Sequence, residues 1–127
     1  MSISVSRFVP AEPAVAWDLL VDTTRWADWG PSVTRVDVPD VRLREHSTGR
    51  VRSPVGVWIP FRVTDFDEGR MWSWSVGGVR ATTHSVERVP GGCRVSFGVP
   101  ALVAPYALVC REALRRIDHL ARAATAS

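Results

Sequence analysis

The chain has 127 residues and a mass of 14.0 kDa, a length that predicts a single domain over residues 1–127. No apolar run approaches the roughly 20 residues that a membrane span requires, and the alternating N-terminus is unlike a signal peptide, so we expect a cytoplasmic protein. All 16 basic residues are arginines, so Schiff-base chemistry on a lysine is excluded. The net charge is +3, but the arginines are dispersed, and we therefore expect no specific nucleic-acid site. The two cysteines are too few for a typical metal site, and we expect no metal or cofactor.

The N-terminal residues predict a strand followed by a short helix. Residues 2–9 alternate between apolar and polar side chains, which is typical of a half-buried strand. We expect Ile3, Val5 and Phe8 to face inward. Pro13 suits the first turn of a helix, and apolar residues at helical spacing extend that helix to about Asp22.

Two tryptophans three residues apart mark a second short helix. Thr23 or Thr24 can cap this helix, which carries Trp26 and Trp29 on one face and ends at Gly30-Pro31. A tryptophan side chain hides roughly 150–250 Å² of surface, so the pair covers either a hydrophobic core or the mouth of a cavity. Both interpretations stay open: two structural rings, or one structural ring and one that faces a ligand.

The middle of the chain is typical of an antiparallel sheet. Alternating segments are separated by clusters of Pro, Gly and Asp that form turns. The predicted strands cover residues 32–38, 47–53, 56–66, 70–77, 79–89 and 93–99, while the segment 41–46 has no assignment.

A long amphipathic helix is predicted from Ala104-Pro105 to about Ala123. Its apolar stripe consists of Val109, Cys110, Ala113, Leu114, Ile117, Leu120 and Ala121. The opposite, solvated face consists of Arg111, Glu112, Arg115, Arg116, Asp118 and Arg122. A sheet of about seven antiparallel strands buries its apolar side by curling around this helix, and two short helices follow the first strand. The expected class is therefore α+β, with the helix-grip fold.

Particular segments also resemble a known group of proteins. Residues 10–22 and 25–33, which hold the first helix and the tryptophan pair, resemble the opening of the SRPBCC superfamily, the START and polyketide cyclase/dehydrase group. Residues 59–64, 72–74 and 84–87 are similar to its middle strands, and residues 91–95 are similar to its last hairpin. The resemblance implies a helix-grip fold with a cavity. It carries over no catalytic set, because the group includes lipid carriers, cyclases, hydrolases and binders.

Strand alternation predicts an aromatic inner wall. Trp72 and Trp74 share one face of their strand, and Thr82 and His84 share the same face of the next one. Residues 59, 61 and 63 are expected to face inward, although a bulge near residue 60 would reverse part of this set. Such a wall is typical of a small-molecule site, and a filled core is the alternative. The candidate ligand-binding residues are Trp26, Trp29, Phe61, Trp72, Trp74, Thr82, Phe97 and Tyr106.

His84 is the one histidine that we expect to face inward. It is either hydrogen-bonded to a neighbour or catalytic, since an imidazole with a pKa of about 6.5 can remove an α-proton from a polyketone. We expect the protein to bind a small hydrophobic or aromatic ligand that is polyketide-like or lipid-like. The alternative is a polyketide cyclase/dehydratase-like enzyme with His84 as acid or base, which needs a second inward acid–base group. The oligomeric state stays open.

Overall fold

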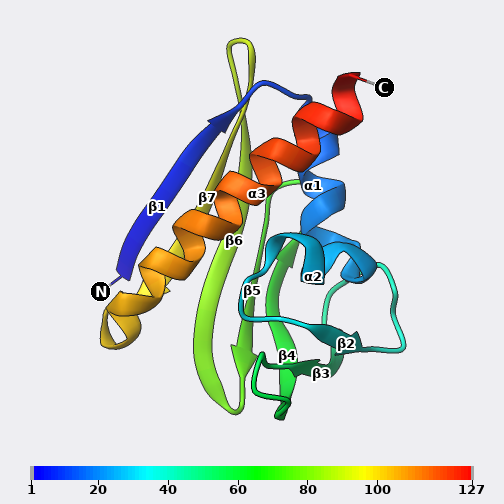
Figure 1. Ribbon diagram of the computed structural model, residues 1–127, viewed down its shortest axis with the longest axis vertical. Helices are drawn as coiled ribbons and strands as arrows, with labels where there is room; N and C mark the ends of the chain where they lie inside the picture. Colours follow the sequence, from blue (N-terminus) through cyan, green and yellow to red (C-terminus); the bar gives the residue numbers. More distant parts are fainter. Residues whose placement is uncertain (1, 127) are drawn as a thin grey trace.

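Seven antiparallel strands form one curved sheet, and the helices lie on its concave side (Figure 1). This computed structural model describes residues 2–126. The strand order across the sheet is β1-β7-β6-β5-β4-β3-β2. The elements are β1 (Ser2–Val9), α1 (Pro13–Val21), η1 (Thr23–Arg25), α2 (Trp26–Trp29), β2 (Arg35–Asp37), β3 (Thr48–Arg52), β4 (Trp58–Asp67), β5 (Met71–Val76), β6 (Val79–Val89), β7 (Gly92–Pro100), η2 (Ala101–Tyr106) and α3 (Ala107–Ala126).

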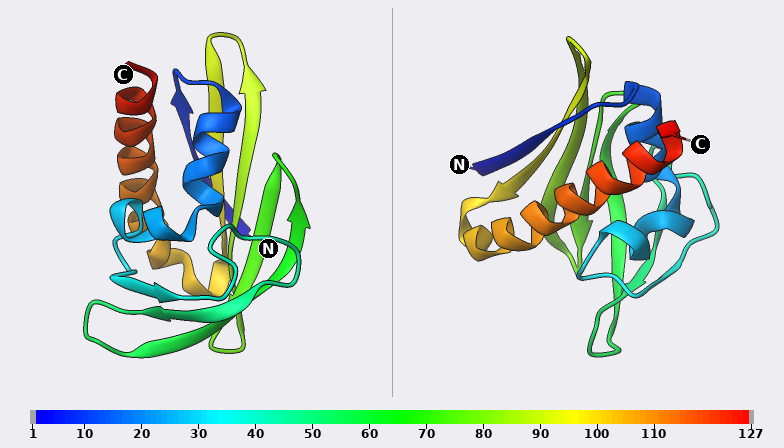
Figure 2. Two further views of the ribbon diagram at one scale, coloured as in Figure 1. Left: turned by 90° about the vertical axis from the view of Figure 1, so that its right-hand side faces the viewer. Right: turned by 45° about the horizontal axis from the view of Figure 1, so that its top comes forward.

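The predicted α+β helix-grip fold is confirmed. Long α3 packs on β1 and β7, while α1 and α2 pack against it, so that the sheet wraps around the helices (Figure 2). Each predicted strand is present with its ends moved by a few residues, and β2 is much shorter than the predicted 32–38. The long helix starts at Ala107 instead of Ala104, because the chain reaches it through the tighter 3₁₀ turns of η2, which contain Pro105.

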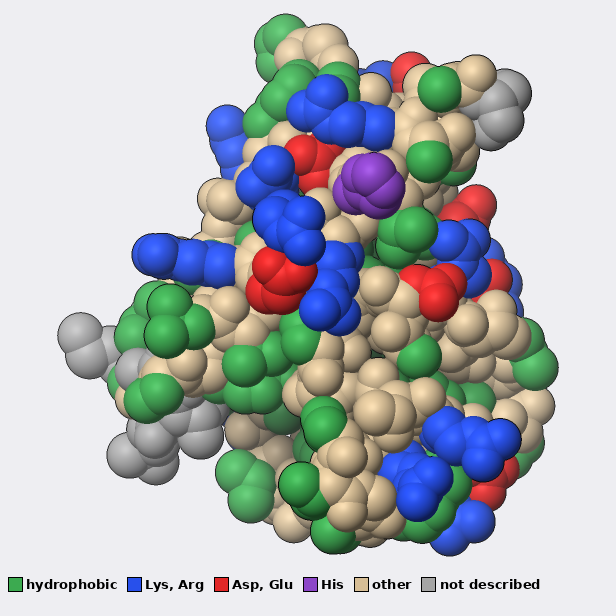
Figure 3. All heavy atoms as spheres, in the orientation of Figure 1, with side chains coloured by type: hydrophobic (Ala, Val, Ile, Leu, Met, Phe, Trp, Pro, Cys, Tyr) green, Lys and Arg blue, Asp and Glu red, His purple; other side chains and the backbone are tan. Residues whose placement is uncertain are grey.

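The apolar stripe of α3 faces the sheet as predicted. Its residues Cys110, Ala113, Leu114, Ile117 and Ala121 are buried. On the outward side, arginine and acidic side chains lie among one another (Figure 3), and Glu112 forms ion pairs with Arg115 and Arg116 one turn away. Within residues 2–126, no helix combines the length and the apolar character needed to cross a membrane.

Asp118 was predicted on the solvated face of α3, and that prediction was wrong. Its side chain is 5% exposed and accepts hydrogen bonds from Arg7 of β1 at 2.7 Å and from Arg122 of α3 at 2.6 Å. Burial alone would raise the pKa of Asp118, but the two guanidinium groups outweigh it and lower that pKa. Two partners thus allow a charged group on the face of α3 that packs against the edge strand β1.

The predicted inward set of β1 is only partly correct. Val5 is buried, but Phe8 is 45% exposed and Ile3 is 39% exposed. Phe8 has the opposite parity to Val5, and its ring lies over Gly91 in the β6–β7 turn. Ile3 has the right parity, but it lies on an edge strand with a pairing partner on one side alone. Val9, which continues the parity of Val5, is fully buried.

A bulge on β4 changes which residues face the concave side. Val63 pairs with Trp74 and Asp65 pairs with Ser73, so Thr64 is an extra residue in β4. Phe66 therefore points to the same side as Val63 despite its even number, and packs edge-to-face on Trp17 at 5.8 Å between ring centroids. The bulge lies at Thr64 and not near Pro60.

A second bulge lies on β6, opposite Trp74. Ser73 pairs with Thr83 and Ser75 pairs with Arg80, so that two residues of β6, at positions 81 and 82, face Trp74. Bulges increase the local twist and bend of a strand. This bulge lies close to the β5–β6 turn, at the lower end of the sheet in Figure 1.

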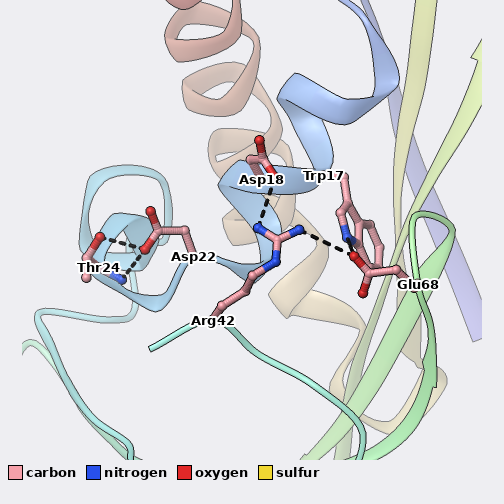
Figure 4. A network of polar contacts seen from close by, with 6 residues as sticks. All are labelled: Trp17, Asp18, Asp22, Thr24, Arg42 and Glu68. Carbon is pink, nitrogen blue, oxygen red and sulfur yellow. Dashed lines mark hydrogen bonds and ion pairs between the residues drawn. The ribbon is translucent and has the colours of Figure 1, made fainter. Parts of the chain in front are cut away.

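The predicted cap by Thr23 or Thr24 is wrong: among the described residues, Arg25 is the N-cap residue of α2 and makes no side-chain cap hydrogen bond, whereas Asp22 caps the preceding 3₁₀ turn η1. Its carboxylate accepts from the Thr24 backbone N–H at 3.0 Å and from the Thr24 hydroxyl at 2.6 Å (Figure 4). A carboxylate accepts these bonds more strongly than a hydroxyl does. The Thr23 hydroxyl instead donates to the Val41 carbonyl at 2.6 Å, which fastens the β2–β3 loop to the helices.

That loop also carries Arg42, which joins three segments of the chain (Figure 4). Arg42 donates to Asp18 of α1 at 3.0 Å and to Glu68 of the β4–β5 turn at 3.3 Å, and Glu68 also accepts the indole N–H of Trp17 at 3.2 Å. Exposed ion pairs of this kind contribute about 0–1 kcal/mol each. The neighbouring Leu43 is buried, and its burial is the larger contribution to holding the loop.

Replacing Ile117 with Asp should prevent folding. Ile117 is fully buried between α3 and the sheet, so the variant would place an unpaired carboxylate in an apolar contact. We expect a loss of at least about 3 kcal/mol in the free energy of unfolding, measured by urea denaturation. Arg111→Asp, on the exposed side of the same helix, is the control and should keep nearly wild-type stability. Wild-type stability of Ile117→Asp would contradict the packing of α3 described here.

Candidate functional site

An aromatic stack fills the middle of the concave face. Trp26 of α2 lies on Trp72 of β5, with ring centroids 5.5 Å apart and planes 14° apart. Trp72 in turn lies on His84 of β6, with centroids 3.8 Å apart and planes 22° apart. Trp74 and Phe61 meet these rings at steep angles. Aromatic pairs contribute about 0.5–1.5 kcal/mol beyond the area they bury, so the stack fastens α2 to the central strands.

The tryptophan pair of α2 is also held by hydrogen bonds to α1. Trp26 donates its indole N–H to the Leu20 carbonyl at 2.9 Å, and Trp29 donates to the Leu19 carbonyl at 2.7 Å. These carbonyls lie in the last turn of α1, where carbonyl groups have no partner within the helix. Both rings are buried. The spacing of the two tryptophans therefore lets each one satisfy a carbonyl at the C-terminus of α1.

A chain of hydrogen bonds orders the polar groups around His84. His84 Nδ1 lies 3.2 Å from the Trp72 carbonyl, which can only accept, so Nδ1 carries the proton. Nε2 of the neutral ring then accepts from the Thr82 hydroxyl at 2.9 Å, and the Thr82 oxygen accepts the Trp74 indole N–H at 3.0 Å. Both ring nitrogens of His84 thus have partners within the protein.

His84 is neutral in the folded protein. Burial lowers the pKa of His84 from 6.5 to about 3, and the hydrogen bond to the Trp72 carbonyl opposes only part of this effect. A group with such a pKa is not protonated near neutral pH, and its acceptor nitrogen is already occupied by Thr82.

Little space remains beside the stack. A cavity of about 30 Å³ lies there, close to the volume of one water molecule. We call it the inner cavity; its border includes Trp26, Trp29, Trp72, His84 and Phe97, together with the first turns of α3. The indole N–H of Trp72 is buried without a hydrogen-bond partner among the described residues.

A larger apolar cleft opens next to the inner cavity, beside the β5–β6 hairpin. Its volume is about 330 Å³. Most of its wall is apolar and comes from β3, β4, β5, the β5–β6 hairpin and the turn after α2. The residues that line this apolar cleft are Ser32, Val33, Val51, Ser53, Pro54, Ile59, Trp74, Val76, Val79, Arg80, Ala81, Thr82 and Tyr106. An apolar wall with a few polar groups is the usual composition of a small-molecule site.

The structure divides the candidate ligand-binding residues into three groups. Trp74, Thr82 and Tyr106 line the apolar cleft. Trp26, Trp29, Trp72 and Phe97 line the inner cavity, as does the candidate catalytic residue His84. Phe61 borders neither space and packs against Trp26 and Trp74 instead.

Seven apolar residues of the cleft wall were not among the sequence candidates. Four of them are buried or half-buried valine and isoleucine residues, namely Val33, Val51, Ile59 and Val76. Ile59 had the correct inward parity and was therefore within reach of sequence reasoning. Val33, Val51 and Val76 lie on short segments or beside a bulge, where alternation alone does not distinguish a cleft wall from core.

The tyrosine and the cysteine at the two spaces are uncharged as well. Burial raises the pKa of Tyr106, and its hydrogen bond with Ser32 opposes part of this effect. Burial also raises the pKa of the Cys110 thiol to about 11. Arg80 is the only charged residue among the described residues that line the cleft. Within residues 2–126, no three His, Cys, Asp or Glu side chains are grouped so as to hold a metal ion.

Comparison with known proteins supports one family and one fold. The profile of the family described as "Polyketide cyclase / dehydrase and lipid transport" matches residues 1–124. None of the curated proteins matches the chain.

Solved structures show the same fold at low sequence identity. The AHSA1-like protein from Aeromonas hydrophila is 17% identical, with a TM-score of 0.77 over 100% of this chain and 96% of that one. Protein MLL2253 from Mesorhizobium loti is 11% identical, with a TM-score of 0.77 over 94% and 96% of the two chains. Protein Ms6760 from Mycobacterium smegmatis is 20% identical, with a TM-score of 0.68 over 97% and 92%.

The buried neutral state of His84 predicts a specific loss of stability in acid. The pKa of His84 is about 3 in the folded protein and about 6.5 in the unfolded chain, so between these values only the unfolded chain binds the proton. Its contribution to stability is complete above about pH 6.5 and declines as the pH falls toward 3. When the pH falls from about 7 to about 5, protonation of His84 in the unfolded chain should lower the free energy of unfolding by about 2 kcal/mol, measured by urea denaturation.

Two variants isolate this contribution from other acid effects. His84→Gln should lose stability at pH 7 but show a pH dependence that is smaller by that amount. His119→Gln, at an exposed position of α3, should keep the wild-type pH dependence. Equal pH dependence of the wild type and His84→Gln would contradict a buried, neutral His84.

Proposed function

The chain belongs to the polyketide cyclase/dehydrase and lipid transport family, and we propose that it binds a small hydrophobic or aromatic molecule in the apolar cleft. The observation that carries the proposal is the cleft itself. Its volume of about 330 Å³ falls at the lower end of the range of about 300–1,000 Å³ found for ligand pockets. The bound molecule would be lipid-like or polyketide-like, with an apolar body that fills the space between Val51, Ile59 and Val76.

The charge distribution favours an uncharged body for this molecule. Histidine, tyrosine and cysteine around the two spaces are neutral at physiological pH, because burial shifts the pKa of each group away from ionisation. No carboxylate belongs to the described lining of the apolar cleft. Arg80, the one charged side chain in that described lining, is exposed to solvent, so a cation would find no partner in the cleft and a buried anion would lose its hydration.

Binding without turnover is also favoured over a cyclase-like reaction. His84, the candidate acid or base, does not border the cleft and lies behind Trp74 and Thr82. A pKa of about 3 leaves it a weak base, and a general base is most effective with a pKa near the working pH. The second acid–base group that an enzyme would need is not among the described lining residues of either space, apart from the neutral Tyr106 and Cys110.

Filling the cleft with a larger side chain tests the proposal. Calorimetric titration with decanol and with 2-naphthol should give saturable binding to the wild-type protein. Ile59→Trp should weaken it at least tenfold, or by about 1.4 kcal/mol, because the new ring occupies the cleft. Arg62→Trp places the same ring on the exposed face of the same strand, and should bind both probes like the wild type.

The same titrations give the contradicting results. Equal weakening by Ile59→Trp and Arg62→Trp, or equal affinity in all three proteins, would place the probes outside the cleft. Saturable binding to none of the three proteins would overturn the proposal.

A further inference from the structure

The apolar cleft and the inner cavity share one wall. Ser32, Val33, Trp74, Thr82 and Tyr106 border both spaces. Trp74 and Thr82 belong to the sheet, Ser32 and Val33 belong to the turn after α2, and Tyr106 ends η2. Three separate parts of the chain therefore meet at the inner end of the cleft.

Tyr106 is the least restrained ring in this wall. Trp74 is held by ring contacts with Trp26, Phe61 and Trp72, and by its hydrogen bond to Thr82. Tyr106 makes no ring–ring contact with any described residue. Its hydroxyl is held by a hydrogen bond with the Ser32 hydroxyl, which joins the end of η2 to the turn after α2. One neutral hydrogen bond contributes about 0.5–1.5 kcal/mol, so displacement of this ring has a low cost.

The space behind Tyr106 suits an apolar chain. The inner cavity is bordered there by Trp29, Phe97, Val109 and Cys110, and the Cys110 thiol is neutral. The cavity is about 30 Å³ while Tyr106 is in place, too small for more than a water molecule. A ligand longer than the cleft gains this second compartment only by moving the tyrosine ring.

We infer that the Tyr106 ring, fastened by Ser32, is the end stop of the ligand site and determines the length of the molecule that binds. This inference rests on the proposed function, because it concerns the same cleft. It makes Tyr106 and Ser32 specificity-determining residues: they admit a short acyl chain or a small aromatic ring system and reject longer chains.

A series of straight-chain alcohols measures the length of the site. Hexanol, octanol, decanol and dodecanol are titrated calorimetrically into each variant. Each methylene that becomes buried should tighten binding by about fourfold, and affinity should level off at the alcohol that fills the cleft. Tyr106→Leu removes the end stop, so affinity should continue to rise toward dodecanol, and the ratio of dodecanol affinity to hexanol affinity should exceed that of the wild type.

Variants that keep most of the packing test the hydrogen bond. Tyr106→Phe and Ser32→Ala each remove it, and each should raise the ratio of dodecanol affinity to hexanol affinity by about fivefold. These two variants decide the question if Tyr106→Leu does not fold. Leu108→Ala, at an exposed position close to Tyr106 on α3, should match the wild type throughout.

The results distinguish a failure of the end-stop inference from a failure of the proposed function. If every protein levels off at the same alcohol with the same affinities, the end stop is wrong and binding in the cleft stands. If the wild type and all variants bind no alcohol, the proposed function fails instead. Tighter binding of hexanol and dodecanol alike would also overturn the end stop, since a change in length selection must change the ratio of the two affinities.

Discussion

The stack of Trp26, Trp72 and His84 determines which part of the concave face is closed and which part is open. It joins α2 to the two central strands and leaves only about 30 Å³ beside the rings. Beyond the stack, Val51 of β3, Ile59 of β4 and Val76 of β5 line open space instead. The apolar cleft lies in that region, bounded by Tyr106 where η2 leads into α3. The rings that stabilise the fold fill the middle of the concave face, and the open site therefore lies toward one end of the sheet.

The stack also sets the electrostatic character of the site. His84 is desolvated because Trp72 covers one of its faces and Trp29 and Phe97 meet it at an angle. Its two ring nitrogens are paired with Thr82 and with the Trp72 carbonyl, so the imidazole is a structural member of a polar network within the core. A network that is satisfied in this way orients Trp74, whose ring forms part of both the stack and the cleft wall.

Much of this fold follows from periodicity in the sequence, because burial on one side of a strand or helix imposes it. The stripe of α3 and the inward parity of Trp72, Thr82 and His84 were both visible without coordinates. Trp58 precedes the inward Ile59 by one residue and so has the outward parity, and its ring centroid lies 4.5 Å from the guanidinium carbon of Arg50. These residues belong to long regular elements, where the alternation is uninterrupted.

The position of the cleft was not predictable in the same way. It depends on bulges at Thr64 and at residues 81–82, and a bulge is a property of how two strands pair, which one strand's pattern does not encode. Asp118 shows a related difficulty: its place on the buried side of α3 depends on Arg7, a residue 111 positions away in the chain. Long-range partners of this kind decide whether a polar residue is solvated or buried.

Intermolecular nuclear Overhauser effects between decanol and the methyl groups of the protein test binding in the cleft most directly. We expect contacts from the alkyl chain to Val51, Ile59 and Val76, three residues from three adjacent strands that converge only in the cleft. Contacts confined to Leu19 and Leu120, in the groove between α1 and α3, would contradict it.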